Sequence, residues 1–178
     1  IARLFAGDTS LACTTSSLAD LEGIINHDLV MINAWSKKWL VNFNPNKTEA
    51  LFFTLQRNFT LPYLEFDNVP VKFVDNHKHL GLTFSSNGKW HDHVDQITTS
   101  ASKVLGIMRK LKYQLNRQSL FQIYVSFLRP VLEYASVVWD GCTQYEKETL
   151  EKIQHEAARI VTGLTRSVTI QNLYKEIN

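Results

Sequence analysis

The sequence has little cysteine, no long apolar run and almost no excess of charge. Its two cysteines, Cys13 and Cys142, stand too far apart for a zinc or redox motif, which favours reduced thiols in an intracellular protein of the nucleus or cytoplasm. No stretch approaches the roughly 20 apolar residues of a membrane span, and no signal peptide indicates secretion. The net charge of +2 is too small for the protein as a whole to attract nucleic acid electrostatically. A nucleic-acid-binding surface must therefore come from a local cluster of basic residues.

What is present fits a folded protein. Hydrophobic residues make up 44% and aromatic residues 11% of the 178 positions, enough for a well-filled core. Charged residues, at 20%, are too few for a disordered chain. The sequence begins at Ile1 within an apolar run rather than at Met. We therefore expect a piece of a longer protein whose N-terminal part is missing.

The first half of the chain mixes strand and helix patterns. Apolar segments at residues 1–5 and 9–13 flank a small-residue turn, which predicts a β-hairpin with Asp8 at its tip. Apolar residues at spacings of three and four predict a helix of about six turns from Ser17 to Trp39. Further strands are predicted at 48–54, 63–66, 69–74 and 79–84, with Asp67-Asn68 as a hairpin turn.

From Trp90 onward the apolar period becomes helical throughout. Helices are predicted from about 90 to 111, from 118 to 139, from 144 to 162 and from 168 to 177. Pro130 should kink or split the second of them, and Gly163 should end the third. The sequence thus predicts an α+β protein with a mixed region at 1–88 and an all-helical region at 89–178.

Three groups of residues carry candidate chemistry. Asp8 offers a carboxylate to a metal, although aspartate is also a common turn former. Lys47 follows an Asn-Pro-Asn turn. Its ammonium group either takes part in chemistry or is simply exposed to solvent. No acidic residue occurs between Gln96 and Leu132, and Tyr113 and Tyr124 fall within this window. Its basic residues are Lys103, Arg109, Lys110, Lys112, Arg117 and Arg129. They form either a surface for a phosphate backbone or an ordinary solvated helix face.

The histidines form two pairs, His77/His79 and His91/His93. Residues two apart share one face of a strand, so the first pair could chelate a metal. Zinc sites need more ligands at recognisable spacing, so we expect surface histidines around a sheet-to-helix junction instead.

Four motifs in a fixed order make the sequence more specific. They are Phe5-Ala6-Gly7-Asp8-Thr9, Asn44-Pro45-Asn46-Lys47-Thr48-Glu49, Lys78-His79-Leu80-Gly81-Leu82-Thr83-Phe84 and Leu128-Arg129-Pro130-Val131-Leu132-Glu133-Tyr134. This series resembles the C-terminal part of reverse transcriptases from non-LTR retrotransposons (LINEs), the jockey-like group in particular. The resemblance covers essentially the whole chain.

The resemblance implies a fold and an activity. Residues 1–88 would be the second part of a reverse-transcriptase palm, with antiparallel strands and one long helix, and 89–178 a helical thumb or connection. The intact protein would be an RNA-directed DNA polymerase, a nucleotidyltransferase that uses an RNA template, a DNA primer and deoxynucleoside triphosphates. Its fingers and first palm half would precede this chain. Two Mg²⁺ ions would be held by a pair of aspartates in the turn and by an earlier palm aspartate.

The resemblance also implies residue roles. Asp8 matches the second aspartate of the turn, whereas Gly7 stands where the first should be, so Mg²⁺ binding and polymerisation are expected to be impaired. Lys47 matches a lysine proposed to protonate the leaving pyrophosphate. Gly81 falls in the segment that holds the primer end, although a kink in the sheet would explain it equally well. The residues expected to bind nucleic acid are Lys103, Arg109, Lys110, Lys112 and Arg117. The alternative is a non-catalytic RNA- or DNA-binding remnant, or a decayed mobile-element copy.

Overall fold

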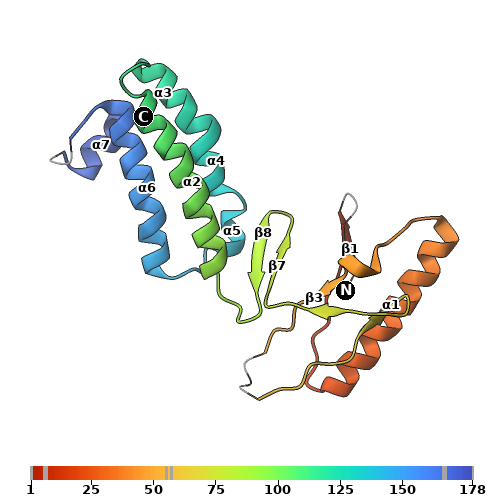
Figure 1. The fold of residues 1–178 in the computed structure, drawn as a ribbon. Helices are drawn as coiled ribbons and strands as arrows, with labels where there is room; N and C mark the ends of the chain where they lie inside the picture. The colour runs from red at the N-terminus through yellow and green to blue at the C-terminus, as the bar shows by residue number, and fades with distance from the viewer. Residues whose placement is uncertain (1, 6–7, 55, 57, 166–167, 178) are drawn as a thin grey trace. The chain divides into compact units, whose positions relative to one another are not determined.

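The computed structural model describes residues 2–5, 8–54, 56, 58–165 and 168–177. The chain divides into two compact units, Ile1–His77 and Lys78–Asn178 (Figure 1). Strands and one long helix make up the first unit and helices dominate the second, so the predicted α+β class is confirmed. The assignment of residues 1–88 to a palm and of 89–178 to a thumb stays a prediction. None of the helices in the described ranges combines the length and apolarity needed to cross a membrane.

The first unit opens with the predicted hairpin. Strands β1 (Ala2–Phe5) and β2 (Asp8–Leu11) pair antiparallel, with Phe5 opposite Asp8. Asp8 therefore begins the second strand rather than standing in the turn. Ala6 and Gly7, and with them the predicted loss of a ligand at Gly7, lie outside the described residues.

Helix α1 (Leu18–Trp39) also has its predicted extent. The Ser17 side chain accepts a hydrogen bond from the backbone N–H of Asp20 at 3.4 Å and so caps the first turn. Leu40 ends the helix with a left-handed φ of 56°.

The apolar stripe of α1 is covered only along its middle. Leu29 is buried in a small cluster, whereas Trp39, at the end of the stripe, is 61% exposed. The other buried members of the cluster are Leu64, Phe66 and Val71.

A tight hairpin forms where Asp67-Asn68 predicted one. Strands β4 (Glu65–Phe66) and β5 (Val69–Pro70) pair antiparallel. Asp67 and Asn68 have φ angles of 50° and 62°, which is the backbone of a type I′ turn.

The predicted buried strand over 48–54 is wrong. Strand β3 (Glu49–Ala50) pairs in parallel with β6 (Lys72–Phe73) and then ends. Phe53 is 55% exposed. A strand continues only while a neighbour satisfies its backbone groups, and β6 is too short to pair with 51–54.

The single strand predicted at 79–84 is also wrong, because the chain turns back within it. Strands β7 (Asn76–His79) and β8 (Leu82–Ser85) form a two-stranded sheet. Leu80 and Gly81 turn the chain with φ angles of 47° and 83°.

In the part of the second unit that the structure describes, seven helical segments follow, and they agree closely with the predicted ranges. They are α2 (His91–Leu111), α3 (Arg117–Ile123), the π-helical turn η2 (Tyr124–Leu128), α4 (Arg129–Glu133), α5 (Ser136–Trp139), α6 (Gln144–Thr162) and α7 (Ile170–Ile177). The second predicted helix is interrupted at η2, next to Pro130, and again at Ala135, where φ is 48°.

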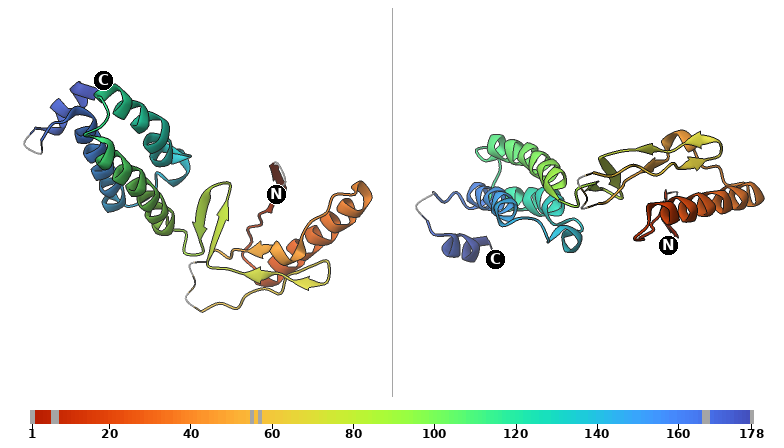
Figure 2. Two further views of the ribbon diagram at one scale, coloured as in Figure 1. Left: turned by 45° about the horizontal axis from the view of Figure 1, so that its top comes forward. Right: turned by 90° about the horizontal axis from the view of Figure 1, so that it is seen from below.

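These helices enclose one core. Both views in Figure 2 show α2, α4 and α6 side by side. Ala101 of α2 and Ala157 of α6 are completely buried, and small side chains at such points let two helices approach closely. The apolar residues whose helical period predicted these helices form this core: Val94, Ile97, Ala101, Leu105, Met108, Leu150, Ile153, Ala157 and Ile160 are all buried.

Candidate functional site

The carboxylate of Asp8 belongs to no cluster of three potential metal ligands among the described residues. Asp8 is exposed at the start of β2. Nowhere in the described ranges do three His, Cys, Asp or Glu side chains gather closely enough to hold a metal ion. Mg²⁺ demands near-octahedral oxygen coordination, which one exposed carboxylate does not provide. The described residues therefore do not fit a Mg²⁺ site, and no catalytic step can be derived from them.

Lys47 ends a short turn built by its own motif. In the 3₁₀ helix η1 (Pro45–Lys47), the Asn44 side chain accepts from the backbone N–H of Asn46 at 3.0 Å. The Thr48 hydroxyl donates to the Asn44 carbonyl at 3.2 Å. These bonds fix the backbone of the motif and leave Lys47 exposed. Its predicted role as a proton donor stays a prediction.

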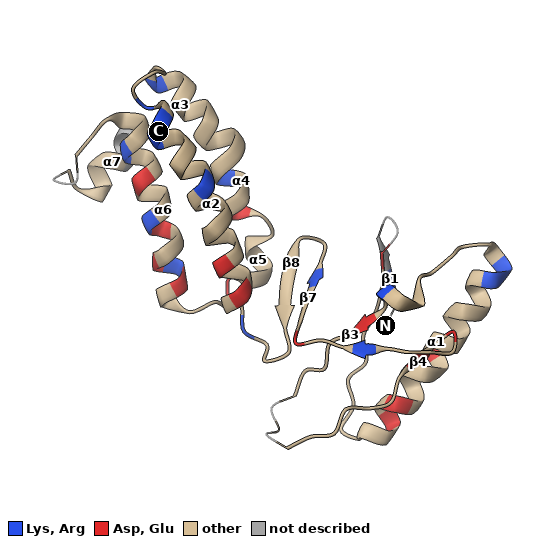
Figure 3. Cartoon of the chain, viewed as in Figure 1, with Lys and Arg blue, Asp and Glu red and all other residues tan. Residues whose placement is uncertain are grey.

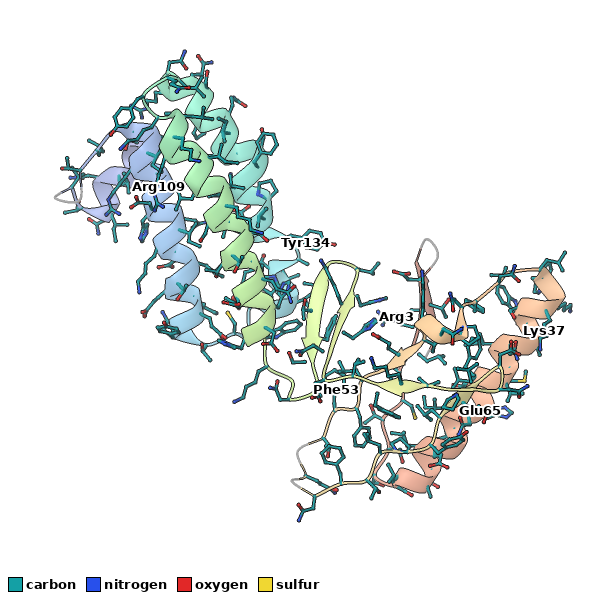
Figure 4. The ribbon with its side chains drawn as sticks, in the orientation of Figure 1. Arg3, Lys37, Phe53, Glu65, Arg109 and Tyr134 are labelled. Atoms are coloured by element: carbon teal, nitrogen blue, oxygen red, sulfur yellow. The ribbon has the colours of Figure 1, made fainter. Side chains whose placement is uncertain are left out.

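Gly81 has a structural reason to be glycine. A Cβ at this position would lie 3.0 Å from Cε1 of Tyr134, and the positive φ already disfavours other residues. The Tyr134 hydroxyl donates to the Leu80 carbonyl at 2.9 Å, and Figure 4 shows this side chain extending toward the hairpin. The predicted role of Gly81 in holding a primer is not needed to explain the residue.

The motif around Arg129 also stabilises the second unit, Lys78–Asn178, which we call the helical unit. Arg129 Nε donates to Glu133 Oε1 at 2.8 Å, one helical turn away. Trp139 Nε1 donates to the Tyr134 carbonyl at 2.9 Å, which satisfies a backbone group where α4 ends.

His93 is buried, which corrects the prediction of a surface histidine. The residue is 3% exposed, and its Nδ1 accepts from the backbone N–H of Thr83 on β8 at 3.3 Å. The rings of Trp90 and Trp139 pack against it. Burial, helped by the charge of Lys78, lowers the pKa of His93. The imidazole therefore joins the β7–β8 hairpin to α2 in its neutral form.

Glu146 lies at the same end of the bundle as His93, in the first turn of α6. Its Oε2 accepts from both the N–H and the hydroxyl of Thr143 at 2.7 Å, forming a capping box. Burial acts to raise the pKa of Glu146, but the bonds from Thr143 and the nearby His91 outweigh it, so the pKa is lowered. His91 Nδ1 lies 3.3 Å from Glu146 Oε1.

Four of the basic residues lie toward one end of the helical unit, and Lys103 lies further back along α2. We call Lys103, Arg109, Lys110, Lys112 and Arg117 the basic corner; all five are exposed. They lie in the C-terminal half of α2, the following turn and the first turn of α3 (Figure 3). Arg109 Nη2 lies 3.4 Å from Glu156 Oε1 on α6. No acidic residue belongs to this stretch of chain, and Glu156 of α6 offsets one of the five cations of the corner.

Two features of the helical unit were missed by the sequence prediction. The contact of Tyr134 with the β7–β8 turn spans more than 50 residues of chain, and no local pattern indicates it. Tyr113 was noted only as an aromatic residue among charges, whereas its side chain is 84% exposed at the end of α2.

Two known proteins are similar to the chain along almost its entire length. It is 24% identical, over 98% of its residues, to a Drosophila melanogaster protein described as "Probable RNA-directed DNA polymerase from transposon BS". It is also 24% identical, again over 98%, to the "Probable RNA-directed DNA polymerase from transposon X-element" of the same organism. The chain spans 20% of the length of each. No family model and no solved structure matches it. The two similarities confirm the resemblance of this chain to a segment of a transposon reverse transcriptase.

Proposed function

We propose that this chain is the palm-and-thumb part of a jockey-like, non-LTR reverse transcriptase, and that its helical unit holds the RNA template and DNA primer through their phosphates. The basic corner is the observation that carries this proposal. Nucleic acid binds such a surface because each phosphate that a lysine or arginine neutralises releases condensed counterions.

The positions of the charges support binding over helix stabilisation alone. Lysine and arginine near the C-terminus of α2 favour the helix dipole and so have a second explanation. Arg117 is different, because it lies in the first turn of α3, where a cation opposes the dipole. Lys103 lies more than one turn before the end of α2 and seven residues before Lys110, so both occupy the same helix face.

A salt titration of duplex binding tests this proposal. The 178-residue chain should bind an RNA–DNA duplex at low salt and lose affinity steeply as salt rises. A variant with Lys103→Gln and Lys110→Gln should lower the slope of log K against log salt by about 1.8, at about 0.9 per phosphate contact. The matched control replaces two lysines of α6, Lys147→Gln and Lys152→Gln, and should keep the slope. Binding that is absent at low salt, or indifferent to salt, would contradict the proposal.

We further propose that polymerisation by this copy is impaired. The support is the sequence at the hairpin, where Gly7 has no side chain to replace a metal-binding carboxylate. In addition, Asp8 belongs to no cluster of three potential ligands among the described residues. Primer extension tests this in a protein that joins the chain to fingers and a first palm half. Gly7→Asp should increase extension. Robust extension by the Gly7 form would show that no impairment exists.

The alternative is a remnant that binds nucleic acid without catalysis. The basic corner and the glycine at position 7 favour it as well. In that case the duplex affinity and its salt slope persist, while Gly7→Asp restores no extension. A decayed copy would show neither binding nor extension.

A further inference from the structure

The turn that joins α2 to α3 presents an aromatic side chain to solvent within the basic corner. Tyr113 is 84% exposed and stands between Lys112 and Arg117 in sequence. We propose that Tyr113 is a stacking platform for an unpaired base, so that single-stranded nucleic acid binds at this end of the basic corner. This inference rests on the proposed nucleic-acid function and specifies the ligand of the same site.

The turn holds the tyrosine in place. The Leu111 carbonyl accepts from the backbone N–H groups of Gln114 and Leu115 at 2.9 Å and 3.0 Å. Leu111 and Leu115, on either side, pack against the core of the helical unit. Tyr113 is thus the outward residue of an anchored turn, and its ordering cost on binding is small because a tyrosine has only two side-chain torsions to fix.

The start of α3 is fixed as well. The Asn116 side chain accepts from the backbone N–H of Ser119 at 2.9 Å, which satisfies one of the free donors of the helix. The chain on both sides of Tyr113 is therefore tied down, so the backbone of Tyr113 keeps a defined position between Lys112 and Arg117.

The surroundings of the ring suit a nucleotide. The ammonium of Lys112 lies 4.6 Å from the centroid of the Tyr113 ring, a cation–π distance. A base stacked on the exposed part of this ring would bring its phosphate close to the cations of the corner. Proteins that bind single strands combine these two elements, a cationic surface for the backbone and aromatic side chains for the bases.

A second exposed tyrosine shows what makes Tyr113 special and serves as its control. Tyr145, in the first turn of α6, is 73% exposed. Its near neighbours in sequence are the buried Glu146, Lys147, whose ammonium pairs with Asp140 at 2.9 Å, and Glu148, so its surroundings are more acidic than those of Tyr113. Exposure of an aromatic ring alone therefore does not make a stacking site; the cationic surroundings distinguish the two positions.

The experiment compares two strands of equal charge, an oligothymidylate of about 16 nucleotides and an abasic strand of the same length, a length at the upper end of common single-strand site sizes. Binding of the whole chain to each strand is measured by fluorescence anisotropy at one salt concentration. The chain should bind the oligothymidylate about 5- to 150-fold more tightly than the abasic strand, the range expected for one stacked base.

Variants assign the preference to the ring. Tyr113→Ala should abolish the preference for thymidylate and leave abasic binding unchanged, whereas Tyr113→Phe, which keeps the ring, and Tyr145→Ala should retain it. Equal binding of both strands by the unchanged chain would overturn the stacking proposal and leave phosphate binding intact. A preference that survives Tyr113→Ala would overturn it too. Binding to neither strand at low salt would contradict both proposals.

Discussion

The helical unit and the strand-containing unit bury their apolar residues to different extents. In the helical unit, Met108 and Leu128 are completely enclosed in a core that also includes both long helices. In the unit before it, the buried cluster consists of Leu29, Leu64, Phe66 and Val71, while Met31 and Leu40 are 57% and 89% exposed. A helix satisfies its own backbone and needs only one partner face, whereas short strands depend on distant neighbours for both bonds and burial.

The largest expected effect lies in the helical core. Leu128→Ala should lower the free energy of unfolding by about 2–5 kcal/mol, because it removes atoms from a closed site and leaves a cavity. Leu29→Ala in the first unit should cost less, since its side chain is 8% exposed and its cluster is small. Urea denaturation with hydrogen exchange of α6 and α1 amides measures both. Equal costs would show that the two cores are equally well packed.

A turn contact gives the next effect. Gly81→Ala should cost about 1–3 kcal/mol, because the new methyl group meets the Tyr134 ring at 3.0 Å and the backbone has a positive φ. Gly88→Ala is the matched control: it also has a positive φ, of 68°, but nothing lies within 4 Å. It should cost only the backbone part, about 1–2 kcal/mol. A thermal melt that shows no difference between them would mean that Tyr134 moves aside freely.

Helix caps sharpen the comparison on a smaller scale. Thr143→Ala should destabilise the helical unit by about 0.5–2 kcal/mol, since it removes one half of a capping box. Ser17→Ala should have a weaker effect on α1, because Ser17 makes a single capping bond, whereas the Thr143 hydroxyl also donates to Glu146 Oε2 at 2.7 Å. Amide exchange in the first turn of each helix reports the two losses separately. A larger loss at Ser17 would reverse the expected order.

The smallest effect is a dependence on pH. The folded chain keeps His93 neutral, whereas the unfolded chain takes up a proton below the ordinary pKa of 6.5. This contribution to stability is full above that pH and is lost as the pH falls below it. Denaturation midpoints from pH 7 downward should decrease in the native chain and flatten in His93→Gln. An unchanged slope in the variant would exclude His93 as the source.

A second acid-sensitive group titrates in a separate window. The lowered pKa of Glu146 makes its capping contribution full above the ordinary value of 4.5, and this contribution is lost as the pH falls below it. The Glu146→Gln variant should therefore be less stable above that pH and show a flatter decline of the denaturation midpoint in the acid range.

The sequence predicted elements whose signals are local. Helix α6 has the predicted ends because Thr143, Glu146 and Gly163 supply a capping box and a left-handed C-cap at those positions. The Asp67-Asn68 turn was likewise predictable, since these residue types tolerate positive φ.

The sequence failed where a distant residue decides the local structure. Leucine rarely adopts a positive φ, yet Leu80 does so in a turn that Tyr134 contacts through its hydroxyl. The apolar segment at 51–54 looked like a strand, but no partner strand pairs with it. For the candidate site, the residue types and their order indicated the family, whereas the exposure of Tyr113 and the burial of His93 depend on packing that spacing does not encode.

The π-helical turn η2 changes the spacing at which residues return to the same face of the helix. Leu120 and Leu128 are both buried, although eight residues separate them and a regular α-helix returns to the same face after seven. The wider turn, in which the Arg129 N–H reaches back five residues to the Tyr124 carbonyl, takes up one extra residue. Deleting one residue within 124–128 would leave an ordinary helix with the same face toward the core. A deletion in the middle of α2 would instead rotate everything beyond it. The length of the chain is therefore more free to vary at η2 than in the middle of α2.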